Sequence, residues 1–220
     1  MAIYGAGGFA REILGPARLQ CGEAGGASGE SVVFVSDIRD DLAKPLDDVR
    51  VIAFDALTGP SHRARQIVIA IADAAVRRAV AARCKAAGMR FLPALRAPTH
   101  RTAQPESNLG EGAIFCDFTM VTAANVRIGA HFHCNIYSYV AHDCVIGDFV
   151  TFAPRVCCNG NVVVEDDVYV GTGAVIKQGR PGAPLVIGKG AVIGMGAVVT
   201  KSVAPGAVVV GNPARPMPQR

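Results

Sequence analysis

The second half of the chain repeats with a period of six residues, and this repeat restricts the possible folds more than any other feature. An apolar residue returns at every sixth position from Ile128 to Ile176, and a second small or apolar residue stands four positions after each member up to Val170. The first series is Ile128, Cys134, Val140, Ile146, Phe152, Cys158, Val164, Val170 and Ile176. After an interruption at Lys177–Val186 the pattern resumes at Ile187. So short and strict a period is typical of a solenoid with stacked units. An ordinary β-sandwich would not keep one register this long.

The repeat resembles that of the hexapeptide transferases. This resemblance implies a left-handed parallel β-helix with three hexads in each triangular coil, so that residues 18 apart lie above one another. Counting backwards in register reaches roughly Gly110, with about four coils before the interruption and at least one after it. Glycine often follows the apolar residue, as at Gly129 and Gly147, where we expect a tight corner to need a small or left-handed residue. The resemblance also implies a symmetric trimer.

Composition agrees with a solenoid. Half of the 220 residues are hydrophobic, but only 6% are aromatic, tryptophan is absent and glycine numbers 25, which suits an interior of small and β-branched side chains. The sequence has no apolar run of about 18 residues or more and no signal-peptide pattern, so we expect a cytoplasmic protein without a membrane span.

The cysteines predict neither a disulfide framework nor a metal site. Their number, seven, is odd, and they show no C-x-x-C spacing. Four of them fall on expected inward positions, where cysteine behaves as a small hydrophobe. These are Cys116, Cys134, Cys144 and Cys158.

The first hundred residues alternate between strand-like and helix-like segments, which predicts a small parallel, Rossmann-like α/β unit. The expected strands are Ala2–Tyr4, Val32–Val35, Gln66–Ile71 and one that begins at Phe91, and a helix is expected over Ala74–Ala87. Pro98–Ser107 is rich in proline, threonine and serine and is interpreted as a linker. We therefore expect one domain over 1–97 and a β-helix domain over 98–220.

The segment GAGGFARE, from Gly5 to Glu12, joins the first strand to a helix. Backbone amides at such a turn form an anion site. Compared with the dinucleotide-binding fingerprint, the segment has Ala10 in place of the third glycine, which is an allowed variant. The spacing alone is therefore weak evidence for a dinucleotide site, and a tight turn without a ligand is the alternative. A dehydrogenase is not favoured, because its domain would be longer.

The segment VAHDCVIGD places His142 at the third position of its hexad, on a corner of the triangular coil. An imidazole there is able to accept a proton at neutral pH, and Asp143 would support its charged form. Gly160 lies one coil above, with a backbone N–H open to a carbonyl oxygen. The alternatives are a polar surface turn and a glycine chosen for geometry. Asn135, near the adjacent corner, is a candidate contact for the acceptor.

Charge is unevenly distributed at the end of the chain. No acidic residue follows Asp167, although the net charge is only +4. Lys177, Arg180, Lys189 and Lys201 are the candidate contacts of a polyanion such as coenzyme A. The interruption at Lys177–Val186 is expected to project as a loop beside it. Nucleic acid is not favoured, because Tyr169 is the only aromatic residue of this segment.

The Gly-rich α/β unit, VAHDCVIGD and the ending VVVGNPARP (Val208–Pro216) together resemble a bacterial sugar acyltransferase family. It contains N-acetyltransferases of nucleotide-linked 4-amino sugars, of the bacillosamine and perosamine type, and sialic acid O-acetyltransferases. The resemblance implies acetyl-CoA as donor, a homotrimer with three sites between subunits, and a role in the synthesis of surface glycans such as lipopolysaccharide. It also implies that the N-terminal unit binds the nucleotide sugar.

The resemblance implies a role for each matching residue. It makes His142 the general base, Asp143 its acidic partner, Asn135 an acceptor contact and Gly160 the donor to the acetyl carbonyl. Gly5, Gly7 and Gly8 match the phosphate-facing loop, and Asp37 matches an acidic residue near the base or ribose. Two features depart from the pattern. Some members carry a second histidine where this chain has Thr151. The first strand is shortened, starting at Met1, which predicts an altered nucleotide site.

These observations predict N-acetylation of a nucleotide-linked amino sugar by direct attack on the thioester, without a metal, with UDP as the leading nucleotide and GDP or dTDP as alternatives. O-acetylation of sialic acid or another sugar, and a non-catalytic sugar-binding trimer, are the competing interpretations. A γ-type carbonic anhydrase is disfavoured by the spacing of His131, His133 and His142. A sugar-nucleotide pyrophosphorylase would need a larger domain with its own glycine-rich signature.

Overall fold

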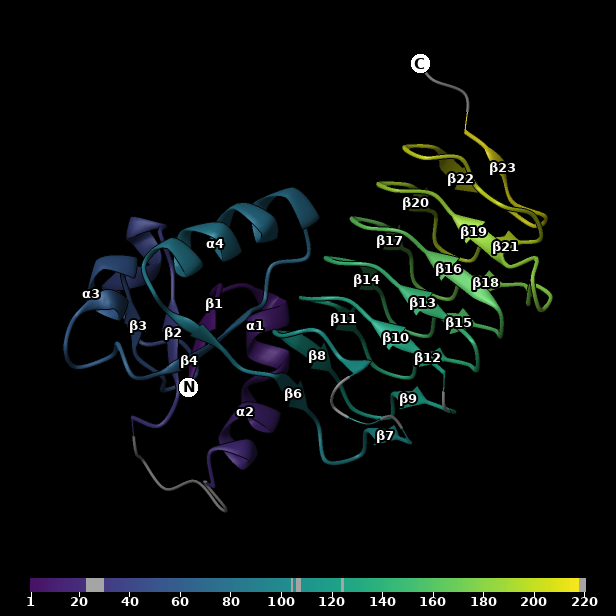
Figure 1. Cartoon of the computed structure of the whole chain (residues 1–220). Coiled ribbons are helices and arrows are strands. Elements are labelled where there is room, and N and C mark those ends of the chain that lie inside the picture. The colour runs from purple at the N-terminus through teal and green to yellow at the C-terminus, as the bar shows by residue number, and fades with distance from the viewer. Residues whose placement is uncertain (23–29, 104, 106–107, 124, 218–220) are drawn as a thin grey trace.

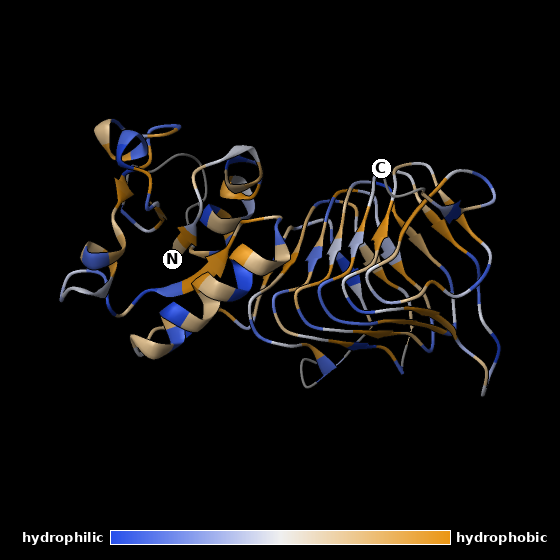
Figure 2. Cartoon of the chain, turned by 90° about the horizontal axis from the view of Figure 1, so that it is seen from above, coloured by the Kyte–Doolittle hydropathy of each residue, from blue (hydrophilic) through white to orange (hydrophobic). Residues whose placement is uncertain are grey.

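The chain forms a small α/β unit followed by a long three-sided β-helix (Figure 1). The computed structural model describes residues 1–22, 30–103, 105, 108–123 and 125–217. Figure 2, turned by 90°, shows the coils of the β-helix stacked one behind another. None of the helices in these ranges is long and apolar enough to cross a membrane.

The α/β unit contains a five-stranded parallel sheet in the order β3-β2-β1-β4-β5. Its strands are β1 (Ala2–Tyr4), β2 (Val33–Val35), β3 (Val51–Ile52), β4 (Gln66–Ile69) and β5 (Arg90–Phe91). Its helices are α1 (Gly8–Glu12), α2 (Leu14–Gln20), the 3-10 helix η1 (Arg39–Ala43), α3 (Phe54–Thr58) and α4 (Ala74–Ala86). The expected strands and the helix over Ala74–Ala87 are confirmed, with ends that differ by a residue or two. β3 and α3 were not predicted, because they are too short to show a period.

Both faces of this sheet are buried, because successive side chains of a strand point to opposite sides. Ala2 and Tyr4 of β1 pack with side chains of α3 and α4. Ile3, between them, packs with α1, α2 and Ile114 of the β-helix. The first strand, although it begins next to Met1, pairs along its whole length with β2 and β4. It is therefore the central strand of the sheet.

Three parallel sheets form the sides of the β-helix. The first, here called the domain-facing sheet, contains β6 (Ala94–Arg96), β8 (Ala113–Phe115), β11 (His133–Cys134), β14 (Thr151–Phe152), β17 (Tyr169–Val170), β20 (Val192–Ile193), β22 (Val208–Val210) and the antiparallel β23 (Arg215–Pro216). The second contains β7 (Arg101–Thr102), β9 (Met120–Val121), β12 (Tyr139–Val140), β15 (Cys157–Cys158), β18 (Val175–Ile176) and β21 (Val198–Val199). The third contains β10 (Arg127–Ile128), β13 (Val145–Ile146), β16 (Val162–Val164) and β19 (Leu185–Ile187).

The six-residue period describes the interior of this β-helix. Ile146 pairs with Val164 and Cys134 pairs with Phe152, in each case the residue three hexads later. Every residue of the predicted first series is at most 3% exposed. The predicted inward positions are thus confirmed from Ile128 onward.

The register before Ile128 is shifted by one position. Cys134 pairs with Phe115 rather than Cys116, and Val140 pairs with Val121 rather than Thr122. The step from Val121 to Ile128 is seven positions instead of six, so counting backwards in sixes fails there. The prediction that Cys116 points inward is wrong: Phe115 takes the inward position, and Cys116 packs against the α/β unit. For the same reason Leu109, not Gly110, aligns with Ile128.

The glycines that follow the inward residues are required for their small size, one of the two expected reasons, and not for a left-handed conformation. None of them has a positive φ, whereas corner residues two positions later do, among them His131 and Phe149. A Cβ on Gly129 would lie 2.5 Å from Asp148 of the next coil. These glycines therefore permit close contact between coils, and the left-handed corner residue comes later.

The interruption at Lys177–Val186 is a corner with extra residues. Val164 pairs with Ile187 rather than with Gly182, the position that three uninterrupted hexads would give. Two further strands lie near the expected domain boundary. β7 lies within the expected linker, and β6, before residue 97, already pairs with β8 of the β-helix. The expected linker residues Gln104, Glu106 and Ser107 lie outside the described residues.

Candidate active site

His142 lies on the corner between β12 and β13. Its side chain is 55% exposed, and Nδ1 lies 2.8 Å from Oδ2 of Asp143. Asp143 has a φ of 56°, a left-handed conformation that aspartate tolerates better than most residues. Because a carboxylate only accepts hydrogen bonds, this contact places the imidazole proton on Nδ1 and leaves the lone pair on Nε2. The pair thus has the geometry of an oriented base.

Gly160 lies directly against the imidazole of His142. A Cβ built on Gly160 would be 2.3 Å from Cε1 and 2.5 Å from Nε2 of the imidazole. The next amide, Asn161 N–H, donates to the carbonyl of His142 at 3.0 Å, so the two coils are in direct contact. The Gly160 N–H itself makes no hydrogen bond to a described residue. The expected column of His142 and Gly160 is therefore present, and only glycine fits beside the ring.

Three of the four predicted cationic residues gather beside this corner. Gly179 N–H donates to the carbonyl of Gly160 at 2.9 Å, so the extended corner continues the same column. Lys177, Arg180 and Lys201 line a pocket of about 360 Å³ there. The structure separates Lys189 from them. Its ammonium lies 4.0 Å from Asp166 and Asp167, at the corner between the third sheet and the domain-facing sheet.

Asn135 is tied into the β-helix. Its side-chain N–H donates to the carbonyl of Phe152 at 2.7 Å, and its backbone N–H donates to the same oxygen. It follows β11 of the domain-facing sheet, one corner before His142 in the same coil. The structure therefore does not bring Asn135 beside His142 within one chain.

The glycine-rich loop joins the carboxyl end of β1 to α1. Gly5 has a φ of 120°, and a Cβ there would lie 3.0 Å from the carbonyl of Ala70, so this position requires glycine. Gly7 and Gly8 have open space where side chains would lie. Of the three glycines, only Gly5 is required by the fold itself.

Asp37 follows β2 at the same edge of the sheet. Its carboxylate accepts the hydroxyl of Tyr4 at 2.6 Å and pairs with Arg83 of α4 at 2.9 Å. The Arg83 guanidinium in turn lies over the ring of Phe54, 3.8 Å from its centre. Burial, with the nearby Asp37 carboxylate, raises the pKa of Tyr4. Because parallel strands end together, Asp37 and the glycine-rich loop lie at one edge, where ligands of open α/β sheets bind.

A buried arginine, which the sequence analysis missed, joins the α/β unit to the β-helix. Arg77 of α4 is fully buried. It donates to the carbonyls of Ile71 at 2.6 Å and Ala72 at 2.9 Å on its own side, and to the hydroxyl of Thr151 at 3.0 Å across the junction. Burial lowers its pKa to about 10, so it remains charged at neutral pH. Thr151, at the position of the second histidine in some relatives, is thus part of this junction.

A signal for Arg77 does exist in the sequence. It shares one helical face with Val80, Ala81 and Cys84, all of which are buried. A charge on an otherwise apolar face indicates a partner from another part of the chain.

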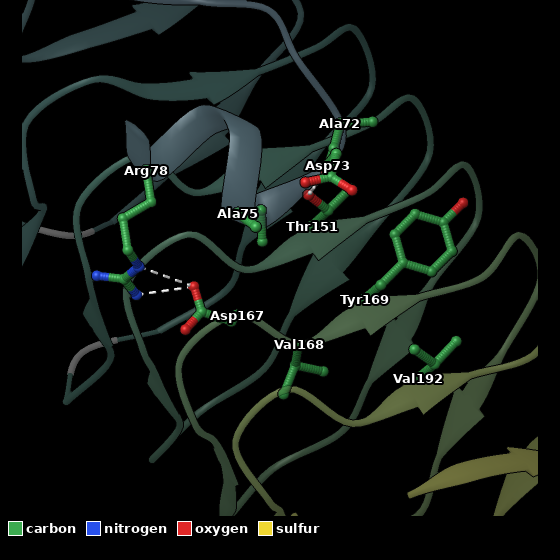
Figure 3. A pocket seen from close by; sticks show the side chains of 10 residues that line it. Ala72, Asp73, Ala75, Arg78, Thr151, Asp167, Val168, Tyr169 and Val192 are labelled. Carbon is green, nitrogen blue, oxygen red and sulfur yellow. Dashed lines mark hydrogen bonds and ion pairs between the residues drawn. The ribbon is translucent and has the colours of Figure 1, made fainter. Parts of the chain in front are cut away.

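Beside this junction a cleft of about 650 Å³ opens between α4 and the domain-facing sheet. Figure 3 shows Asp73 above Thr151, Tyr169 and Val192 to the right, and the ion pair of Arg78 and Asp167 to the left. The remaining lining residues are Ala72, Ala74, Ala75 and Val168. The cleft lies at the carboxyl end of β4, because Ala72 and Asp73 follow this strand.

The other histidines have structural surroundings. His131 packs between the rings of Phe91 and Phe149, and His133 Nε2 lies 2.8 Å from the carbonyl of Ile69. Burial lowers the pKa of His131 to about 4 and that of His133 well below its usual value. Neither is near His142 in the coil. Within the described ranges, no group of three or more His, Cys, Asp or Glu side chains has a metal-binding arrangement.

The two parts of the site lie on opposite sides of the coil. The α/β unit and the cleft contact the domain-facing sheet (Figure 1). His142 lies on the corner between the second and third sheets, which is the corner opposite that side. One chain therefore directs its own nucleotide loop and its own His142 in different directions.

Comparison with known proteins gives relatives that span the chain. It is 43% identical over 215 residues, 98% of its length and 95% of the other chain, to GDP-perosamine N-acetyltransferase of Escherichia coli O157:H7. The structure of WeeI from Acinetobacter baumannii AYE superimposes with a TM-score of 0.88 at 43% identity, covering 98% of both chains.

A more distant structure also covers 98% of both chains. The acetyltransferase domain of PglB from Neisseria gonorrhoeae FA1090, in complex with acetyl coenzyme A, superimposes with a TM-score of 0.80 at 25% identity. No protein-family profile matches the chain.

Proposed function

The chain belongs to the bacterial sugar acyltransferase family that includes GDP-perosamine N-acetyltransferase, and on this premise we propose that it transfers the acetyl group of acetyl-CoA to the amine of a nucleotide-linked amino sugar. The observation that carries the proposal is the column of His142 and Gly160, in which an oriented base lies against a glycine whose backbone N–H has no hydrogen bond to a described residue. The family also supports a left-handed β-helix and a Rossmann-like N-terminal unit. The name of the E. coli relative favours GDP over UDP, the leading nucleotide on the sequence alone.

The chemistry follows from the positions of these groups. Nε2 of His142 removes a proton from the amine as it attacks the thioester carbon. The Gly160 N–H donates to the oxygen of the tetrahedral intermediate, where negative charge develops. Asp143 stabilises the imidazolium through Nδ1. When the intermediate collapses, the carbon–sulfur bond breaks and coenzyme A leaves as the thiolate.

We place coenzyme A along the extended corner, with its phosphates near Lys177, Arg180 and Lys201. The pocket lined by these residues adjoins Gly160, and no acidic residue follows Asp167 in the sequence. The nucleotide part of the acceptor is assigned to Gly5–Gly8 and Asp37. Asn135 is kept as a candidate contact from a neighbouring subunit.

We further propose that the site is shared between copies in a homotrimer. One chain holds its nucleotide loop and His142 on opposite sides of the coil, so a second copy is needed to bring an acceptor and a base together. A closed cyclic arrangement provides three equivalent sites of this kind. Cytoplasmic location and a role in surface-glycan synthesis stay predictions.

The first test is acetyl transfer to GDP-, UDP- and dTDP-linked amino sugars, free amino sugars and sialic acid. We expect turnover of a nucleotide-linked amino sugar, with GDP preferred. Activity confined to sialic acid hydroxyls, or equal turnover of the free amino sugar, would contradict the proposal.

A mixing experiment tests the shared site. Chains carrying His142→Ala and chains carrying Gly8→Glu, which adds a negative side chain in open space at the phosphate loop, are each expected to be nearly inactive. Refolded together in equal amounts, they should regain about a quarter of wild-type activity, because random cyclic trimers then contain that share of intact sites. No recovery in confirmed mixed trimers would show that each chain uses its own histidine.

A further inference from the structure

The peptide bond between Asn159 and Gly160 has two polar groups, and the proposed chemistry uses only one of them. The N–H belongs to Gly160 and makes no hydrogen bond to a described residue, whereas the C=O belongs to Asn159. The peptide is trans, so the two groups point in opposite directions. A contact that holds the Asn159 carbonyl therefore also sets the direction of the Gly160 N–H.

The Asn159 carbonyl is held by a thiol from the interior of the β-helix. Sγ of Cys144, which is fully buried, lies 3.2 Å from this oxygen. The thiol also lies 3.5 Å from the carbonyl of His142, but that oxygen already accepts the N–H of Asn161 at 3.0 Å. The Asn159 oxygen accepts no backbone N–H from a described residue, and the thiol of Cys158 is more distant, at 3.9 Å. The single proton of the Cys144 thiol is therefore needed at Asn159.

A hydroxyl makes the same contact one corner earlier in the chain. Oγ of Ser138 donates to the carbonyl of Ala153 at 2.9 Å, and this pair, like Cys144 and Asn159, is 15 residues apart. The residue after Ala153 is Pro154, which has no N–H to direct. At Cys144, by contrast, the peptide that is held carries the N–H that the proposed chemistry uses.

Glycine makes this peptide easy to rotate. Gly160 has to be glycine, because a Cβ would lie 2.3 Å from Cε1 of His142, and glycine adopts backbone conformations that other residues avoid. A peptide that turned over would exchange the directions of its N–H and C=O. The site would then present a carbonyl oxygen to the developing oxyanion, and the two would repel each other.

We propose that Cys144 is a positioning residue, whose thiol holds the Asn159–Gly160 peptide with its N–H directed at the reacting thioester. The inference rests on the proposed function, in which this N–H stabilises the tetrahedral intermediate. A donor that is aligned before the reaction does not have to reorganise as charge develops. The thiol also polarises the peptide, because hydrogen bonds in a chain strengthen one another.

Four variants separate the hydrogen bond from the volume of the side chain. Cys144→Ser keeps a donor, and Ser138 shows that a hydroxyl suits this kind of position. Cys144→Val fills the space without a donor, and Cys144→Ala has neither. Cys134→Ala is the matched control, because it removes the same sulfur from the same buried interior, on the sheet that faces the α/β unit.

Turnover and stability should respond to different properties of the side chain. We expect kcat to fall about fivefold to tenfold in Cys144→Ala and Cys144→Val, because a buried carbonyl without a donor no longer favours one orientation. KM for both substrates should not change, since the oxyanion is absent from the ground state. Cys144→Ser should keep the kcat of the wild type or exceed it. Both alanine variants should lose thermal stability through their cavities, but Cys134→Ala should keep its kcat.

Crystal structures of Cys144→Val and Cys144→Ser provide a measurement that does not depend on activity. In Cys144→Val the Asn159 carbonyl should turn away from the interior in at least part of the molecules. In Cys144→Ser it should keep its direction, because the hydroxyl replaces the thiol as donor.

Wild-type kcat in Cys144→Val, or a loss in Cys144→Ser as large as that in Cys144→Ala, would overturn the proposal. So would an Asn159 carbonyl that keeps a single direction in Cys144→Val. If the carbonyl turns as expected but the wild-type protein transfers no acetyl group, the proposed function fails, and the role of Cys144 in holding the peptide stands.

Discussion

At the scale of the residue, the candidate chemistry depends on one contact, the imidazole of His142 against the Cα of Gly160. The imidazole is exposed and contributes nothing to the core, so its loss should not affect folding. Gly160 makes no contact through a side chain, yet any side chain there would occupy the place of the imidazole. The two positions therefore act as one unit.

We predict that His142→Ala lowers kcat by about two to four orders of magnitude, the usual contribution of a general base. Gly160→Ala should cause a loss of similar size, because its methyl group displaces the imidazole. Thermal unfolding of both variants should match the wild type, since a side-chain end moves and the backbone does not. Gly173→Ala, at a corner where a Cβ meets nothing within 4 Å but φ is 72°, is the control: it should lower stability and keep kcat. A fully active Gly160→Ala enzyme would contradict the claim that the contact between His142 and Gly160 is needed for catalysis.

At the scale of the element, the extended corner and α4 each perform one task. The corner between β18 and β19 adds residues next to Gly160 and carries cations there. α4 carries the buried arginine that joins the two parts of the molecule. Both tasks are separable by mutation.

Charge reversal tests the corner. Lys201→Glu should raise KM for acetyl-CoA about tenfold, the effect expected when a contact to a charged group becomes repulsive, with KM for the nucleotide sugar unchanged. Lys189→Glu is the matched control, because it lies at another corner beside Asp166 and Asp167. Steady-state kinetics with each substrate varied in turn provide both constants. An unchanged KM for acetyl-CoA in Lys201→Glu would show that this corner does not bind acetyl-CoA.

Arg77→Met tests the junction. It leaves the carbonyls of Ile71 and Phe149 without their buried donor, so we expect the free energy of unfolding to fall by about 3 kcal/mol or more. Arg78→Met removes a half-exposed ion pair with Asp167 and should cost less than about 1 kcal/mol. Urea unfolding measures both. An equal loss of unfolding free energy in Arg77→Met and Arg78→Met would mean that burial of the Arg77 guanidinium does not contribute to stability.

At the scale of the whole molecule, the junction between the α/β unit and the β-helix contains histidines that stay neutral when folded. His131 and His133 lie there, close to the positive charge of Arg77, and burial is the largest cause of their lowered pKa values. Folded and unfolded chains therefore bind different numbers of protons in mild acid.

This difference predicts acid sensitivity. Between pH 6.5 and about 4 the unfolded chain binds a proton at His131 that the folded chain does not, so stability falls as pH falls. The full effect of one such histidine is on the order of 3 kcal/mol. Chemical denaturation at pH 7.5, 6, 5 and 4.5 should show this decline. His131→Asn, which accepts the left-handed φ of 55° at this corner, should reduce the slope. A pH-independent free energy of unfolding would contradict the assignment.

The six-residue period of the sequence determined the interior of the β-helix from Ile128 onward. Together with the three hexads per coil that the family resemblance implies, it also determined the column of His142 and Gly160. The physical reason is that covalent spacing sets these contacts: once the period and the number of hexads per coil are given, the neighbour of His142 in the next coil follows. The family resemblance named the glycine-rich loop and Asp37, and the structure places both at one edge of the sheet. Counting in sixes failed at Cys116, where one extra position before Ile128 shifts the register.

Only the tertiary structure decided which side of the β-helix faces the α/β unit. Arg77 and Thr151 are 74 residues apart, and no local period relates them. The same holds for the cleft between Asp73 and Tyr169, and for the separation of Lys189 from Lys201, which the shared charge pattern had grouped together. These contacts depend on how two independently patterned units pack, and packing of buried surface is specified by the whole fold and not by spacing along the chain.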